Sequence, residues 1–167
     1  MSRMELDSSA FEQVSLHDVR VYALVFQRLE HQGNLVLDID YLAEWNCSPD
    51  GGHEFLVVPA TLTFIDMVDL EIHLGWGTSV YRREPYGVIC CPSGELIVDD
   101  CRRAAYTDPV YIDKSGAYFR YELDFWEPKG GRISLGARDF KLIGRQDGVR
   151  SSQQTLDFAQ RTPLMPS

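Results

Sequence analysis

The most constraining feature of this sequence is a two-residue rhythm in residues 35–45, which read LVLDIDYLAEW. Successive side chains of a β-strand point to opposite faces of a sheet, whereas a helix would spread the same residues around its circumference. The rhythm therefore predicts a strand with one apolar and one acidic face. The apolar face would carry Leu35, Leu37, Ile39, Tyr41, Ala43 and Trp45, and the other face Asp38, Asp40 and Glu44.

Similar short runs recur along the chain, separated by turn sequences rich in Gly, Pro, Asp and Ser. They predict strands within residues 19–26, 55–64, 69–74, 87–91, 95–100, 118–126 and 133–142. One short helix is expected in residues 151–161, with Ser151 or Ser152 as its N-cap. The pattern predicts an all-β or β-rich α+β fold, built as an antiparallel sandwich or partly closed barrel with at most one short C-terminal helix.

Length and composition predict a single folded domain. The chain has 167 residues, of which 44% are hydrophobic and 25% charged, as is typical of a globular domain. We expect residues 1–14 to form a flexible N-terminal segment and residues 15–150 a single β-rich domain. Residues 151–167 would then form a C-terminal tail.

Two regions of the chain read alike. Residues 37–41 (LDIDY) match residues 121–125 (YELDF), and each is followed by a turn and a strand pair. The second strand of each pair begins with an aspartate, in residues 69–72 (DLEI) and 139–142 (DFKL). An internal duplication would explain the match and would create a pseudo-twofold surface on which acidic residues converge. Amphipathic hairpins that merely look alike are the alternative.

The net charge of −9 limits the classes of partner. It argues against nucleic acid and anionic lipid, which need a basic surface, and it permits a basic protein partner. No apolar stretch reaches the roughly 18 residues that would span a membrane. Without an apolar leader we expect a cytoplasmic protein, in which Cys47, Cys90, Cys91 and Cys101 would be free thiols that mostly pack as small hydrophobic side chains.

Several motifs follow one another in a fixed order along the chain: residues 16–18 (LHD), 37–41 (LDIDY), 59–64 (PATLTF), 68–70 (VDL), 131–133 (GRI) and 152–156 (SQQTL). This ordered set resembles a family of stand-alone bacterial proteins of uncharacterised function. The resemblance covers roughly residues 15–161 and implies a soluble bacterial protein, but it implies no activity, cofactor or catalytic residue. More loosely, the early His-Asp pair followed by a β-meander resembles some immunity proteins that bind and neutralise toxins.

Two groups of side chains are candidates for chemistry. His17 and Asp18 could form a general base with its orienting carboxylate or a pair of metal ligands. The structural alternative is a strand entry in which Asp18 caps backbone N–H groups and His17 packs on the first strand. The acidic residues could form a solvated sheet face, a surface for a basic partner, or paired catalytic carboxylates. They are Asp38, Asp40, Glu44, Glu122 and Asp124.

An aromatic and basic loop is the third candidate. It carries Trp76, Tyr81, Arg82 and Arg83 within an otherwise acidic chain. Trp, Tyr and Arg are enriched at interaction hot spots, so this loop is a candidate contact surface. The structural alternative is that Trp76 plugs one end of the sandwich.

Motifs for metal binding, phosphate binding and nucleophilic catalysis are absent from the sequence. We therefore expect no catalytic residue, metal or cofactor, and a non-enzymatic protein-binding module, for instance one of the immunity type. One alternative is a small-molecule-binding or hydrolytic β protein, which a polar pocket above about 300 Å³ would favour. The other is a structural homodimer with paired edge strands, which an interface above about 1,000 Å² would favour.

Overall fold

The computed structural model describes residues 4–30, 33–76, 82–84, 87–89, 95–107, 118–162 and 164. These residues form a ten-stranded antiparallel sheet and a separate two-stranded ribbon, so the predicted all-β class is confirmed. The sheet order is β1-β11-β4-β3-β2-β8-β9-β10-β5, and β12 pairs with β4. The strands are β1 (Glu5–Asp7), β2 (Arg20–Arg28), β3 (Gly33–Cys47), β4 (His53–Ile65), β5 (Val68–His73), β6 (Arg82–Glu84), β7 (Gly87–Ile89), β8 (Ile97–Ala105), β9 (Phe119–Glu127), β10 (Arg132–Ala137), β11 (Asp139–Gly144) and β12 (Val149–Ser151).

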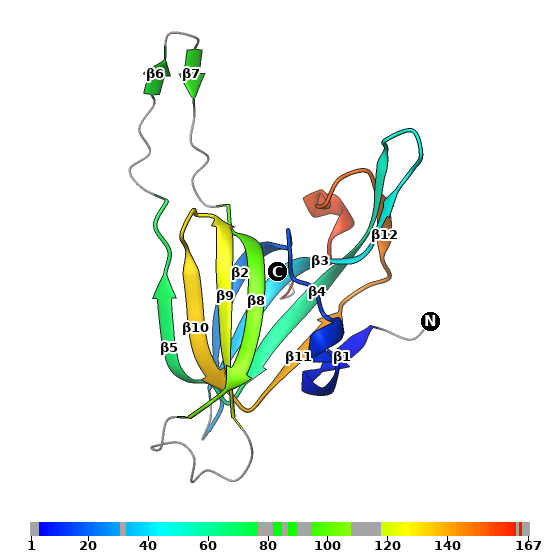
Figure 1. The fold of residues 1–167 in the computed structure, drawn as a ribbon. Coiled ribbons are helices and arrows are strands. Elements are labelled where there is room, and N and C mark those ends of the chain that lie inside the picture. Colours follow the sequence, from blue (N-terminus) through cyan, green and yellow to red (C-terminus); the bar gives the residue numbers. More distant parts are fainter. Residues whose placement is uncertain are drawn as a thin grey trace.

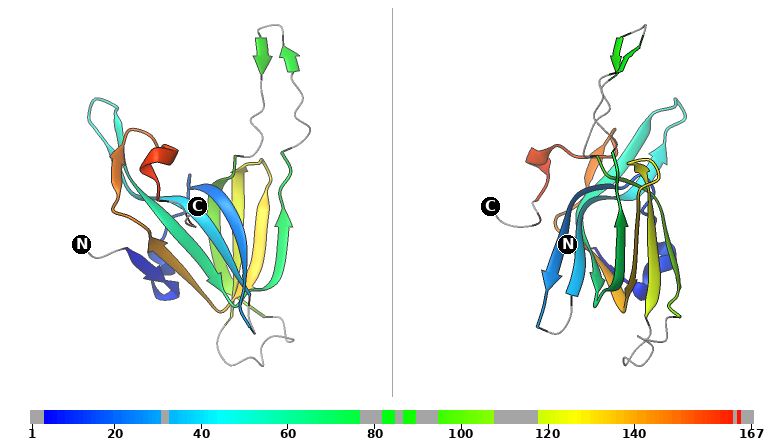
Figure 2. Two further views of the ribbon diagram at one scale, coloured as in Figure 1. Left: turned by 180° about the vertical axis from the view of Figure 1, so that it is seen from behind. Right: turned by 90° about the vertical axis from the view of Figure 1, so that its left-hand side faces the viewer.

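The sheet bends over on itself into two layers. Strands β5, β10, β9 and β8 lie in one layer, and β2, β3, β4 and β11 lie in the other (Figures 1 and 2). The chain passes between the layers at two corners, from β4 to β5 and from β10 to β11, and neither corner joins strands that pair with each other. The result is a partly closed barrel. It is not fully closed because its two edge strands, β1 and β5, do not pair with each other.

The topology has twofold symmetry. Strands β2-β3-β4 and β8-β9-β10 form two three-stranded meanders, and each meander is followed by one more strand, β5 or β11, that crosses to the other layer. Exchanging the two sets of four strands reproduces, in reverse, the order of the sheet without β1 and β12. The crossing strand of each half completes the meander of the other half, because β5 pairs with β10 and β11 pairs with β4. The strands that correspond are the ones whose sequences read alike, which supports the duplication hypothesis.

The predicted alternation in β3 is confirmed on its inner face as far as Tyr41, whereas Ala43 and Trp45, predicted to share that face, are exposed beyond the bulge between Leu42 and Glu44. Leu35, Leu37, Ile39 and Tyr41 are all buried in the main core. Residues from both layers meet there around Tyr121, which is fully buried and contacts the rings of Phe11, Phe64 and Phe140.

Both corners are held by an aspartate. Asp66 adopts a positive φ of 54° at the first corner and accepts hydrogen bonds from Tyr118 Oη at 2.5 Å and Arg138 Nη2 at 2.6 Å. At the second corner the Asp139 carboxylate accepts the Ser8 hydroxyl and the Phe140 backbone N–H. These contacts tie each bend to residues far along the chain.

Several segments differ from the sequence-based predictions. Residues 4–14, expected to be flexible, contain β1, which pairs with β11, and the 3-10 helix η1 (Ser8–Gln13). The helix expected in residues 151–161 is reduced to the single 3-10 turn η2 (Phe158–Gln160). The predicted strands within residues 87–91 and 95–100 correspond to β7 and β8 but do not pair with each other: β7 pairs with β6, and β8 pairs with β9 and β2.

Candidate functional site

The outer side of β8, β9 and β10 carries a lattice of charged side chains, which we call the outer acidic face. Arg102 on β8 lies between the two carboxylates of β9, with Nη2 at 2.6 Å from Asp124 and 3.3 Å from Glu122. Arg132 on β10 donates from Nε to the other oxygen of Asp124 at 2.8 Å. The face consists of Asp99, Asp100, Arg102, Glu122, Asp124, Trp126, Glu127 and Arg132.

Asp124 is the most strongly constrained carboxylate of this face. Partial burial raises its pKa, but hydrogen bonds from Arg132 and Arg102 outweigh that cost and hold the pKa below its ordinary value. The same bonds raise the pKa of Arg102. Asp124 therefore stays ionised and fixed between two strands at neutral pH.

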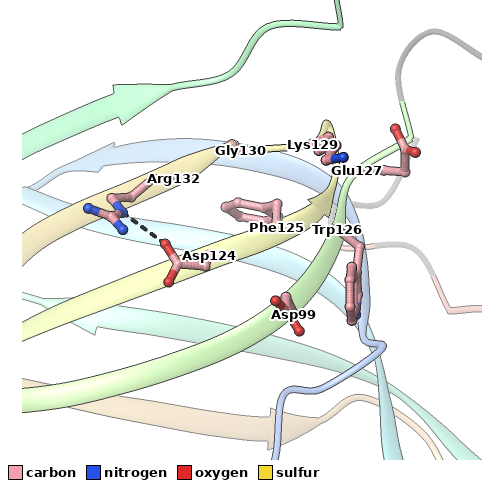
Figure 3. Close-up of a pocket in the computed structure, with 9 residues that line it drawn as sticks. Asp99, Asp124, Phe125, Trp126, Glu127, Lys129, Gly130 and Arg132 are labelled. Atoms are coloured by element: carbon pink, nitrogen blue, oxygen red, sulfur yellow. Dashed lines mark hydrogen bonds and ion pairs between the residues drawn. The ribbon is translucent and has the colours of Figure 1, made fainter.

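A groove of about 630 Å³ opens at the end of this face, where β9 turns into β10 (Figure 3). Trp126 forms one wall and is 52% exposed as a residue, although tryptophan is usually well buried. Asp99 lies beside Trp126, and the Arg132–Asp124 ion pair lies at the other side of the groove. Among the described ion pairs, none uses Glu127 or Lys129, which also line the groove.

His17 and Asp18 lie next to this groove. His17 Nδ1 is 2.7 Å from the backbone oxygen of Asp99, and the imidazole contacts Trp126 edge-on with ring centroids 6.2 Å apart. The carboxylates of Asp18 and Asp99 are each 3.7 Å from a ring nitrogen of His17. Asp18 has a positive φ of 62° and accepts from Gln154 Nε2 at 3.1 Å. The pair thus connects β8, the groove and the C-terminal tail.

The prediction that Asp38 and Asp40 lie on a polar outer face is wrong in one respect, because both are buried. Residues 152–162, which we call the strap, run across the outer side of β3 and cover them. Arg161 donates from Nε to Asp40 and from Nη2 to Asp38, both at 2.8 Å. Arg145 Nη2 also pairs with Asp38, and Tyr22 Oη donates to Asp40 at 2.8 Å.

The strap is held by apolar contacts as well as charges. Leu156 is buried against Phe55 and Val57 in a second, smaller core. Burial and the hydrogen bond to Asp40 raise the pKa of Tyr22. Desolvation lowers the pKa of Arg161, but its bonds to Asp40 and Asp38 outweigh that effect and raise it. Asp38 and Asp40 are therefore anchors of the tail and are not open to a partner in this structure.

The remaining predicted residues lie elsewhere. Glu44 is exposed on the long β3–β4 hairpin and pairs with Arg150 Nη2 at 3.2 Å, so it does not join Glu122 and Asp124. Trp76 packs partly against the main core and donates from Nε1 to the Glu95 oxygen at 2.6 Å, which supports its structural alternative. Tyr81 lies outside the described residues, as do the side chains of Arg82 and Arg83.

The rest of the described surface offers little other chemistry. A second groove of about 430 Å³ is mainly apolar and lies on the outer side of β2, β3 and β4. No group of three or more His, Cys, Asp and Glu residues that could hold a metal ion occurs among the residues that the structure describes. In the same part of the chain, no helix has the length and apolar character needed to cross a membrane.

Comparison of the chain with protein-family models, with curated proteins and with solved structures finds no match. The assignment of a site therefore rests on geometry. Sequence reasoning identified Glu122 and Asp124 but missed Asp99 and Trp126. Trp126 continues the two-residue alternation of those carboxylates and could have been found from it. Asp99 could not, because it reaches the groove from a bulge in β8 between Val98 and Asp100.

Proposed function

We propose that the protein is a non-enzymatic protein-binding module of the bacterial cytoplasm that recognises a basic partner through the outer acidic face. The observation that carries the proposal is the half-exposed ring of Trp126 in an open groove bordered by carboxylates. Tryptophan is the side chain most enriched at interaction hot spots, where a ring of less energetic contacts excludes water. An immunity-type role, in which the partner is a toxin, is one form of this function.

The rigidity of the face supports the proposal. Its charged side chains project from paired strands and are held by cross-strand ion pairs, so little side-chain entropy is lost when a partner docks. Carboxylates outnumber basic side chains on the face, and the whole chain carries a net charge of −9. This excess favours a basic partner and speeds its association.

A small ligand is the second candidate, because the groove exceeds the size at which a pocket can hold one. The groove favours a protein side chain instead. It is open to solvent on one side, whereas small-molecule sites enclose most of the ligand. Asp124 and Arg132, the polar groups at its far side, already bond each other.

The test compares two matched substitutions. Trp126→Ala and Trp45→Ala each remove an indole ring that is about half exposed, one from the groove and one from the distant β3–β4 hairpin. Immobilised wild-type protein and both variants are incubated with an extract of the source organism, and bound proteins are identified by mass spectrometry. Each is then purified and its affinity is measured by calorimetry.

We expect one basic protein to bind the wild type and Trp45→Ala, with an affinity that falls as salt is raised. Trp126→Ala should weaken that affinity at least about tenfold, the loss expected for a hot-spot residue. Equal binding by all three proteins would contradict the proposal. Recovery of only a metabolite that Trp126→Ala no longer binds would replace it with the small-ligand function.

A further inference from the structure

The twofold topology places the two acidic pairs of the chain at equivalent positions. Asp38 and Asp40 lie on the outer side of β3, and Glu122 and Asp124 lie on the outer side of β9, the equivalent strand. In each half, the preceding strand carries a bulge beside the pair, between Val21 and Ala23 in β2 and between Val98 and Asp100 in β8. The two halves thus present similar outer surfaces.

The first of these surfaces holds a segment of the chain itself. The strap lies across it, and Arg161 is its anchor: the guanidinium stacks 3.6 Å from the centre of the Tyr22 ring and bonds two carboxylates. A backbone N–H of the strap, that of Leu156, also donates to Asp40 at 3.0 Å. This half therefore shows how the surface binds an extended segment, through an aromatic ring and a carboxylate pair around one arginine.

The second surface has no strap within the described residues. Arg102 and Arg132 neutralise Glu122 and Asp124 from the flanking strands, but both carboxylates remain partly exposed. The groove at the end of this surface offers the same two kinds of group as the arginine site, an aromatic ring and a carboxylate, although these residues are not the twofold equivalents of Tyr22, Asp38 and Asp40. Trp126 supplies an exposed ring, and Asp99 beside it supplies a carboxylate that no lysine or arginine engages in any described ion pair.

We propose that the groove seats an arginine side chain from an extended segment of the basic partner, stacked on Trp126 and bonded by Asp99. This inference rests on the proposed function and names the chemistry that the partner must present. A planar guanidinium can stack on an indole and donate to carboxylates at the same time, whereas a lysine ammonium offers only a point charge.

The test uses three nine-residue peptides of alternating serine and a second residue, which is arginine, lysine or citrulline. Citrulline keeps the planar shape of arginine without its charge. Each peptide is titrated into the full-length protein, and the indole N–H signals of the three tryptophans are followed by NMR. The matched variants are Asp99→Asn in the groove and Glu44→Gln on the β3–β4 hairpin.

We expect the arginine peptide to move the Trp126 signal in a saturable way and to bind at least about threefold more tightly than the lysine peptide. Citrulline should leave the signal unmoved. The groove variant should weaken arginine binding about tenfold, and the hairpin variant should leave it unchanged. Equal binding of arginine and citrulline, or an unmoved Trp126 signal, would overturn the inference.

The two proposals can fail separately. If Trp126→Ala loses a basic partner but the peptides show no preference for arginine, the binding function stands and the arginine seat is wrong. If the arginine peptide binds at Trp126 but partner capture is the same for every variant, the seat stands as a chemical property and the proposed function is wrong.

Discussion

Arg161 donates a 2.8 Å hydrogen bond to Asp40, a residue 121 positions earlier in the chain. The side chain of Arg161 is only 4% exposed and that of Asp40 is fully buried, so neither charge has water as an alternative partner. A buried ion pair of this kind contributes little net stability compared with apolar residues, but it fixes which segment covers the strand. It therefore specifies the path of the strap.

Removal of Arg161 should be costly because it leaves the Asp38 and Asp40 carboxylates buried and less compensated. Arg161→Ala is expected to lower the free energy of unfolding by about 3–5 kcal/mol. The control is Arg150→Ala, which breaks exposed ion pairs with Glu44 and Glu54 and should cost less than about 1 kcal/mol. Urea denaturation measures both, and equal costs would show that the strap charges are not structurally important.

The small core under the strap gives a second prediction. Leu156 is buried there, while Phe158, two residues later, is 82% exposed. Leu156→Ala should lower the free energy of unfolding by about 2–4 kcal/mol, because it removes buried apolar surface and leaves a cavity. Phe158→Ala should change it by less than about 1 kcal/mol. A small effect of Leu156→Ala would mean that the strap is not packed on β4 in solution.

The described cysteines should differ in reactivity. Cys47 is exposed at the end of β3, whereas Cys101 packs against the main core, and burial raises the pKa of its thiol to about 12. Because the thiolate is the reacting form, iodoacetamide at pH 8 should label Cys47 and spare Cys101 in the folded protein. Peptide mass spectrometry before and after unfolding in urea measures this. Equal labelling of both residues in the folded state would contradict the burial of Cys101.

Asp124 predicts a specific pH dependence of stability. Its folded-state pKa is lowered, so its contribution is present above the unfolded value near 3.8 and is lost as the pH falls through the folded value. Asp124→Asn should lower the free energy of unfolding at pH 7 by no more than about 1 kcal/mol, because the site is partly exposed. The loss is measured as a lower melting temperature. The difference from the wild type should shrink below about pH 4. A difference that is constant with pH would show that the ion pairs with Arg102 and Arg132 are not responsible.

Sequence reasoning predicted the fold well because side-chain alternation reports directly on sheet faces. It placed Ile39 and Tyr41 in the core, and it matched Asp69, the second residue of β5, with Asp139, the first residue of β11. The offsets of the matched segments are 84 and 70 residues, and the difference of 14 (84 − 70) reflects the long β3–β4 hairpin, which the tight β9–β10 turn lacks.

The sites were harder to predict because an acidic residue has the same appearance in the sequence whether water or an arginine satisfies it. No sequence feature near Asp38 or Asp40 indicates that Arg145 and Arg161 pair with them, because those contacts span more than a hundred residues. Glu122 and Asp124 looked identical to that pair and remained partly exposed. The two acidic pairs differ because the strap covers Asp38 and Asp40 but not Glu122 and Asp124. The path of such a segment cannot be predicted from side-chain alternation in the sequence.

The exchange of β5 and β11 between the two meanders has a consequence for how the protein reaches its native state. Neither half can complete its own sheet, because the strand that finishes each one is supplied by the other. The polypeptide must therefore bring distant stretches together before either layer is finished, which is the situation that makes assembly slow and cooperative. When only the first half has left the ribosome, β2, β4 and β5 each still lack a strand that pairs with them in the native sheet.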